Sequence, residues 1–146
     1  MSDVDYLVIK VGENRFGVDA ATVQDVFYLR GVTPVPTAAE EVVGILNLRG
    51  RIVTAVCARR RLGLPPRPAD AAEPKAVGTD VGGDAYGLVV DEVEGVLRLD
   101  RTEIMSPGEL PKGWDVITDG AYRLPAGLLL IMDIHRLFAI SCDLAA

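Results

Sequence analysis

The chain has 146 residues, which is enough for one domain or for two small subdomains that share a core. Its hydrophobic content of 49% is typical of a folded globular protein, and its net charge of −6 argues against general nucleic-acid binding. No apolar run approaches the roughly 20 residues that cross a bilayer and no signal peptide begins the chain, so we expect a cytoplasmic protein without direct membrane insertion.

Short apolar runs separated by glycines are the pattern of small β-barrels rather than of helical bundles. Residues 5–12 predict the first strand, and Gly12–Asn14 predicts the turn that follows it. Residues 20–27 predict a short helix instead, because their apolar side chains recur at helical spacing. Residues 38–44 predict one more turn of helix that ends at Gly44.

The segment Gly44–Leu64 predicts a hairpin followed by a basic helix. Its two apolar runs read as strands, and Gly50 supplies the positive φ that the turn between them needs. Arg49 then lies at a corner, where a rigid scaffold presents side chains to partners. Residues 57–63 predict a short helix that points its arginines outward.

Positive charge is concentrated around this segment. Residues 42–69 contain six arginines and no acidic residue, so they carry +6 and the remainder of the chain carries −12. A basic patch on an acidic body suits a protein partner of complementary charge. For Arg59–Arg61, a solvated helix face that only maintains solubility remains an equal alternative.

The second half of the chain repeats the pattern of the first. Leu64–Lys75, rich in proline and alanine, is the predicted connector. Further strands are predicted at residues 76–81, 85–93, 95–100, 115–124 and 127–132, with a helical turn at 133–140. The motif Phe16-Gly17-Val18 recurs 70 residues later as Tyr86-Gly87-Leu88. This offset indicates two similar β subdomains that are related by duplication.

Residues that could perform chemistry are few and scattered. His135 is the one histidine and is expected on a helix surface, and the two cysteines, Cys57 and Cys142, fit neither a disulfide framework nor a metal site. The carboxylates of residues 91–94 are expected on an exposed strand edge, because an alternating strand would point them to both faces. No nucleotide-binding loop is present. The sequence therefore predicts a binding module rather than an enzyme, without metal or cofactor.

The segment GILNLRGRIVTAVCARRRLGL, Gly44–Leu64, resembles the central signature of the CheW family, the coupling proteins of bacterial chemotaxis. Three other segments also resemble that family, namely YLVIKVGENRFGVDAATVQDVF, YGLVVDEVEGVLRL and GLLLIMDIHRLF, and the matches follow one another in order along the chain. The resemblance implies a mainly β fold of two SH3-like five-stranded β-barrel subdomains with short helices. The two would share a hydrophobic interface and form a single domain over residues 4–141, with strands free to cross between them.

The resemblance also implies function. Family members are non-catalytic adaptors that link the cytoplasmic tip of chemoreceptors to the regulatory domain of a CheA-type histidine kinase, which would recruit this protein to membrane-associated receptor arrays. The implied partner-binding residues are Val23, Asp25, Val43, Gly44, Asn47, Arg49, Gly50, Val93 and Val96. We further expect Val23, Val43 and Val93 to form the apolar centre of an interface, and Arg49 to hydrogen-bond Asp25.

Departures from the family pattern leave an alternative open. Asp25 stands where many members carry glutamate, and Thr54-Ala55 replaces a usual Pro-Val pair. The chain could thus be a divergent paralogue that serves a non-chemotactic kinase array, or one that competes for receptor or kinase sites. A small-ligand binder or enzyme that uses the groove between subdomains is the more distant alternative.

Overall fold

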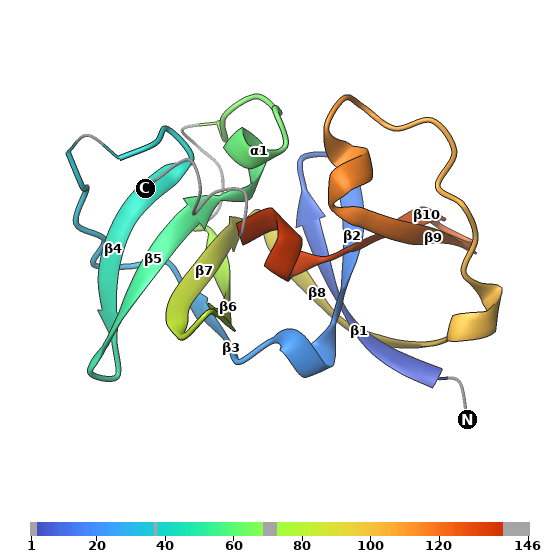
Figure 1. The fold of residues 1–146 in the computed structure, drawn as a ribbon, viewed down its shortest axis with the longest axis horizontal. Helices are drawn as coiled ribbons and strands as arrows, with labels where there is room; N and C mark the ends of the chain where they lie inside the picture. The colour runs from blue at the N-terminus through green and yellow to red at the C-terminus, as the bar shows by residue number, and fades with distance from the viewer. Residues whose placement is uncertain (1–2, 37, 69–72, 139–146) are drawn as a thin grey trace.

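The structure, a computed structural model, describes residues 3–36, 38–68 and 73–138. Its strands form two five-stranded sheets that lie side by side (Figure 1). The first sheet has the order β8-β1-β2-β10-β9, with the bounds β1 Asp3–Val11, β2 Asn14–Asp19, β8 Glu92–Asp100, β9 Thr118–Leu124 and β10 Gly127–Met132. The second has the order β3-β6-β7-β5-β4, with the bounds β3 Asp25–Tyr28, β4 Val42–Leu48, β5 Arg51–Cys57, β6 Lys75–Val81 and β7 Asp84–Val90.

Helical segments are short. They are the 3-10 turns η1 Ala20–Thr22, η2 Arg101–Glu103 and η3 Trp114–Val116, the α-helix α1 Ala58–Arg61, and a helical stretch at residues 134–138. The last confirms the described part of the predicted turn at 133–140, whose end lies outside the described residues. The predicted fold class, mainly β with two five-stranded SH3-like barrels, is confirmed.

The two sheets exchange strands between the halves of the chain. The antiparallel hairpin β1–β2 is completed by β8, β9 and β10, whereas the equivalent hairpin β6–β7 is completed by β3, β4 and β5. In both sheets the halves join through a parallel ladder, β2 with β10 and β7 with β5. Parallel neighbours need a long connection, and here residues 20–126 connect β2 to β10 and residues 58–83 connect β5 to β7. The 70-residue repeat therefore corresponds to equivalent strands, but neither half alone completes a barrel.

Apolar side chains fill three clusters that follow the period-2 alternation of the strands. On β1, Tyr6 and Val8 point into the first barrel, whereas Ile9 and Val11 point into a central cluster between the sheets. The second barrel has its own smaller cluster around Ala55. The central cluster combines buried residues of both sheets, so it is the predicted shared hydrophobic interface. Each large aliphatic side chain buried there contributes about 1.5–3 kcal/mol.

Two predicted helical segments are wrong. Of residues 20–27 only Ala20–Thr22 are helical, and β3 follows because Asp25–Tyr28 pair with β6. Residues 38–44 do not end in a helix at Gly44, because β4 already begins at Val42. In both places pairing with a distant strand overrides a local pattern. The hairpin predicted within Gly44–Leu64 is confirmed as β4 and β5.

Candidate functional site

The turn between β4 and β5 is a tight two-residue hairpin. Leu48 pairs with Arg51, and the two central residues have positive φ, 53° at Arg49 and 84° at Gly50. The side-chain Oδ1 of Asn47 accepts a hydrogen bond of 2.9 Å from the Gly50 amide. Positive φ at both positions is the geometry that matches the twist of the flanking strands. Three predicted site residues, Asn47, Arg49 and Gly50, thus build one rigid corner.

Arg49 forms the predicted ion pair with Asp25. Its Nη1 lies 2.5 Å from Asp25 Oδ2, and the side chains are 77% and 25% exposed. Asp25 begins β3 and Arg49 follows β4, which are the two outer strands of the second sheet. The ion pair therefore links the two edge strands of this sheet, and most of the guanidinium remains exposed to a partner.

Gly44 is required because another part of the chain passes too close to it for a Cβ, and not because it ends a helix. A Cβ at Gly44 would lie 2.4 Å from the Thr33 carbonyl oxygen and 2.7 Å from Val32 Cγ1. Next to it, Thr33 and Ile45 exchange two backbone hydrogen bonds of 2.8 and 2.9 Å. These bonds attach the segment after β3 to β4, so Gly44 allows the second barrel to close.

The predicted apolar residues divide between two places. Val23 and Val93 are half-buried and pack against the central cluster, whereas Val43 packs against the cluster of the second barrel. The single apolar centre that we expected from Val23, Val43 and Val93 is therefore not formed. Val96, on β8, is 57% exposed.

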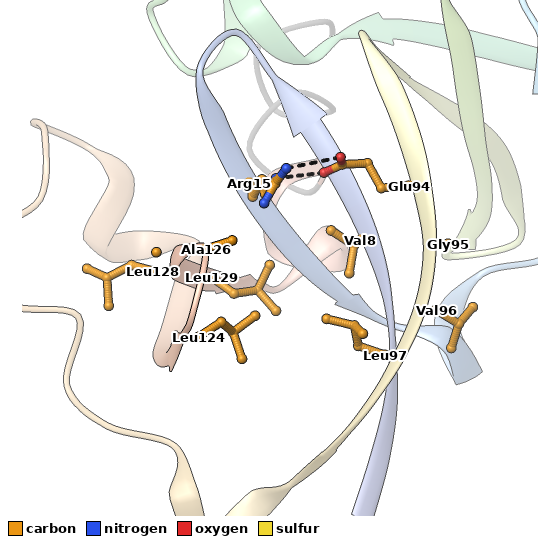
Figure 2. Close-up of a pocket in the computed structure, with 11 residues that line it drawn as sticks. Val8, Arg15, Glu94, Gly95, Val96, Leu97, Leu124, Ala126, Leu128 and Leu129 are labelled. Carbon is orange, nitrogen blue, oxygen red and sulfur yellow. Dashed lines mark hydrogen bonds and ion pairs between the residues drawn. The ribbon is translucent and has the colours of Figure 1, made fainter.

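A small apolar hollow of about 190 Å³ opens at the mouth of the first barrel. Figure 2 shows Val8, Leu97, Leu124 and Leu129 turned toward one another there, with Val96 on the other side of the β8 ribbon. Arg15 closes one side of the hollow through an ion pair with Glu94, 2.8 Å between Nε and Oε1 (Figure 2). Sequence reasoning missed this mouth, since its residues come from strands far apart in the chain.

The mouth of the second barrel is the structural counterpart of that hollow. By strand register Gly95, which pairs with Val8, occupies the place of Asp25, which pairs with Gly78. The hairpin Leu124–Gly127 likewise corresponds to Leu48–Arg51, so the place of Arg49 is taken by a proline. An ion pair at the place of Arg49 and Asp25 therefore exists only at the second mouth, whereas at the first mouth Arg15 of β2 pairs with Glu94 of β8. The second mouth encloses about 240 Å³.

Arg59 does not point outward as predicted. Its guanidinium binds Asp91, with 2.8 Å between Nη2 and Oδ2, and the side chains are only 16% and 14% exposed. The same carboxylate accepts a 2.6 Å hydrogen bond from the Gly12 amide. Burial opposes the ionisation of Asp91, but the hydrogen bonds from Arg59 and Gly12 and the charge of Arg67 outweigh it and lower its pKa.

This network corrects the prediction of an exposed strand edge at Asp91. The residue lies in the bend between β7 of the second sheet and β8 of the first, where it ties α1 to the β1–β2 turn. Of the other two arginines in α1, Arg60 is exposed as predicted, and Arg61 is half-buried.

A metal-binding cluster is not found in the part of the chain that the structure describes. No group of three or more His, Cys, Asp or Glu residues is placed there to hold a metal ion. His135 Nε2 lies 3.4 Å from Thr79 Oγ1. Cys57 is a free thiol, and Cys142 falls outside the described residues. None of the described helices is long and apolar enough to span a membrane.

Comparison with known proteins agrees with this architecture. The chain is 30% identical over 144 residues to the chemotaxis protein CheW of Thermotoga maritima, covering 94% of this chain and 89% of that protein. It is 25% identical to the chemotaxis protein CheW of Treponema pallidum, over 91% of this chain and 81% of that one. The crystal structure of the scaffolding protein TtCheW from Thermoanaerobacter tengcongensis superposes with a TM-score of 0.82 at 25% identity, covering 92% of both chains. The sequence model of the CheW-like domain matches residues 5–141, and the chain therefore belongs to the CheW-like domain family.

Proposed function

We propose that this chain is a non-catalytic adaptor of chemotaxis, which couples chemoreceptors to a CheA-type histidine kinase. The observation that carries the proposal is the exposed Arg49 corner, held rigid by its turn and by Asp25, in a chain whose relatives are named chemotaxis protein CheW. A solved relative is named a scaffolding protein, which supports assembly rather than turnover as the role. Residues 4–141 would act as one cytoplasmic domain that joins membrane-associated arrays through its partners.

The proposed binding surface has two parts. The corner of Asn47, Arg49 and Gly50, with Asp25 behind it, offers a charged and preorganised contact. The exposed Val96 on β8 offers an apolar contact next to the mouth of the first barrel. A contact set with apolar and charge-assisted parts suits a protein partner, because apolar burial supplies affinity and charge supplies orientation.

The proposal is tested by titrating the protein separately with the regulatory domain of a CheA-type kinase and with a receptor-tip fragment, using calorimetry. Wild-type protein is expected to bind both. Arg49→Asn and Val96→Asp are each expected to weaken binding of at least one partner about tenfold, the loss of one good interfacial contact. Arg123→Gln, which removes one exposed arginine from β9, is the matched control and should bind like wild type.

Binding of neither partner by folded wild-type protein would overturn the coupling role. Binding of both partners that neither Arg49→Asn nor Val96→Asp weakens would keep the role and reject this surface. Loss of the folded state in Arg49→Asn, seen by circular dichroism, would assign Arg49 to structure instead, and Val96→Asp would then carry the test alone.

A further inference from the structure

A third cavity lies at the other end of the molecule from the Arg49 corner. In Figure 1, α1 and the adjoining η3 turn are at the top, whereas η1 and the β4–β5 turn are at the bottom. Between the end of α1 and the start of η3 the chain leaves a cavity of about 210 Å³. One wall is residues 60–63, which follow β5 of the second sheet, and the other is residues 112–114 with Ile117, which precede β9 of the first.

Positive charge converges on this cavity. Arg60, Arg61 and Lys112 line it, and its lining residues include no carboxylate. This stands out on a protein with a net charge of −6. Cations gathered in a concave site raise the local potential for an anion more than the same cations spread over a flat surface.

The three cations remain available to a ligand. Arg61 is half-buried and its Nε donates to the Leu137 carbonyl oxygen at 3.4 Å, with no acidic partner among the described residues. Lys112 is exposed, and it too lacks an acidic partner in the described ranges. Arg60 pairs with Glu40, which is 86% exposed, at 3.2 Å. Exposed pairs of this kind are weak, so Arg60 can exchange Glu40 for a better-placed anion.

The walls of the cavity are fixed before any ligand arrives. Trp114 is buried, and its Nε1 donates a 2.9 Å hydrogen bond to the Leu62 carbonyl oxygen, which joins the two walls. Gly63 and Gly113 turn the chain with φ of 74° and 90°, and a Cβ at either would meet nothing within 4 Å. The backbone of the two walls is therefore in place before binding, and the exposed side chains of Arg60 and Lys112 become ordered on binding.

We propose that this cavity binds a phosphate group. Three cations around one small volume favour a compact dianion over a single carboxylate, since a phosphate monoester carries about −1.5 to −2 charges at neutral pH. Arginine offers the paired N–H donors that fit phosphate oxygens, and Lys112 adds a point charge. A phosphate held there would bridge the two sheets through Arg61 and Lys112. The site is separate from the proposed coupling surface and does not depend on it.

The cavity contains its own reporter, because Trp114 is the one tryptophan of the chain. We would titrate the full protein with inorganic phosphate at constant ionic strength, following Trp114 fluorescence and the amide NMR signals of Gly63 and Gly113. Adenosine monophosphate would be titrated in parallel to separate free phosphate from a phosphate ester. Sodium chloride and a short glutamate peptide would complete the set of probes.

Matched variants locate the site. Lys112→Gln and Arg61→Gln are each expected to weaken phosphate binding about tenfold, in line with losing one charge-assisted contact. Arg123→Gln removes the same charge from β9 and should leave binding unchanged. Since Arg61→Gln also removes the bond to Leu137 and could disturb folding, the exposed Lys112→Gln variant keeps the test decisive.

Saturable binding of phosphate or of the monophosphate, weakened by Lys112→Gln and not by Arg123→Gln, supports the proposal. Binding of the ester alone makes a phosphorylated ligand the occupant, and equal binding makes the free ion sufficient. An equal response to chloride would reduce the effect to screening and overturn the proposal. Binding of the glutamate peptide but not of phosphate would assign the cavity to an acidic protein segment and overturn the proposal. No change in Trp114 fluorescence or in the two amide signals with any probe would also overturn it.

Discussion

Arg49 combines two opposed effects at a single residue. Its φ of 53° lies in the left-handed region, which costs a residue with a β-carbon about 1 kcal/mol, while its ion pair with Asp25 is largely exposed and contributes less than about 1 kcal/mol. We therefore expect Arg49→Ala to lower the free energy of unfolding by under about 1 kcal/mol in urea denaturation. Arg49→Asn should lose less, since asparagine tolerates positive φ. A loss of several kcal/mol in both variants would mean that the corner holds the barrel together.

Gly44 and Gly50 show that two glycines in one hairpin have different roles. A Cβ at Gly44 would collide with the Thr33 carbonyl oxygen, whereas a Cβ at Gly50 meets nothing within 4 Å and is only strained by its φ of 84°. Gly44→Ala is expected to cost about 2–4 kcal/mol, because the Thr33–Ile45 bonds must separate, and Gly50→Ala about 1 kcal/mol. Urea denaturation of the two variants measures the contrast. Equal losses of unfolding free energy in the two variants would show that the segment at Thr33 moves away from a Cβ at residue 44 at little cost.

At the scale of elements, the β4–β5 hairpin was predictable from sequence and the short edge strand β3 was not. The alternating β4 and β5 and the glycine turn between them are local patterns, so the sequence suffices to place them and the Arg49 corner. β3 was mistaken for helix because its partner β6 lies about 50 residues away, and no local period records that pairing. Separation along the chain also hides the contact of Arg59 with Asp91, which are 32 residues apart, and the apolar hollow at the first mouth. Helical spacing in a short segment therefore remains ambiguous until its strand partner is known.

The junction of α1, the β7–β8 bend and the β1–β2 turn depends on the charge of Asp91. The pKa of Asp91 is lowered in the folded state from its ordinary value of 3.8, so its stabilising effect is complete above that value and is lost as pH falls through the lower folded pKa. Asp91→Asn should lower stability by about 1–3 kcal/mol at neutral pH, since it weakens hydrogen bonds to a charged acceptor. Urea denaturation between about pH 5 and pH 2 should show the wild type losing more stability than Asp91→Asn. The control is Asp5→Asn, which removes an exposed pair with Arg98 and should change neutral stability less; an equal change would contradict the role of burial.

At the scale of the whole molecule, we expect strand exchange to make the two barrels one folding unit. Each barrel needs strands from both halves of the chain, and the central apolar cluster is shared by both sheets. Opening one barrel would therefore expose apolar side chains that pack against the other barrel. A scaffold that must hold surfaces at a fixed separation gains from this arrangement, because independent opening would let the corner and the opposite cavity move relative to each other.

This linkage predicts a single cooperative unit in native-state hydrogen exchange. The parallel ladders supply matched probes, with the amides of residues 16–17 and 130–131 in the first barrel and of residues 54–57 and 86–88 in the second. We expect the slowest amides of both ladders to exchange with the same free energy, equal to that of global unfolding from urea denaturation. Gly44→Ala, although it acts in the second barrel, should lower protection equally in both ladders. Protection that falls only in the second barrel would show that the barrels unfold separately and that the shared cluster does not couple them.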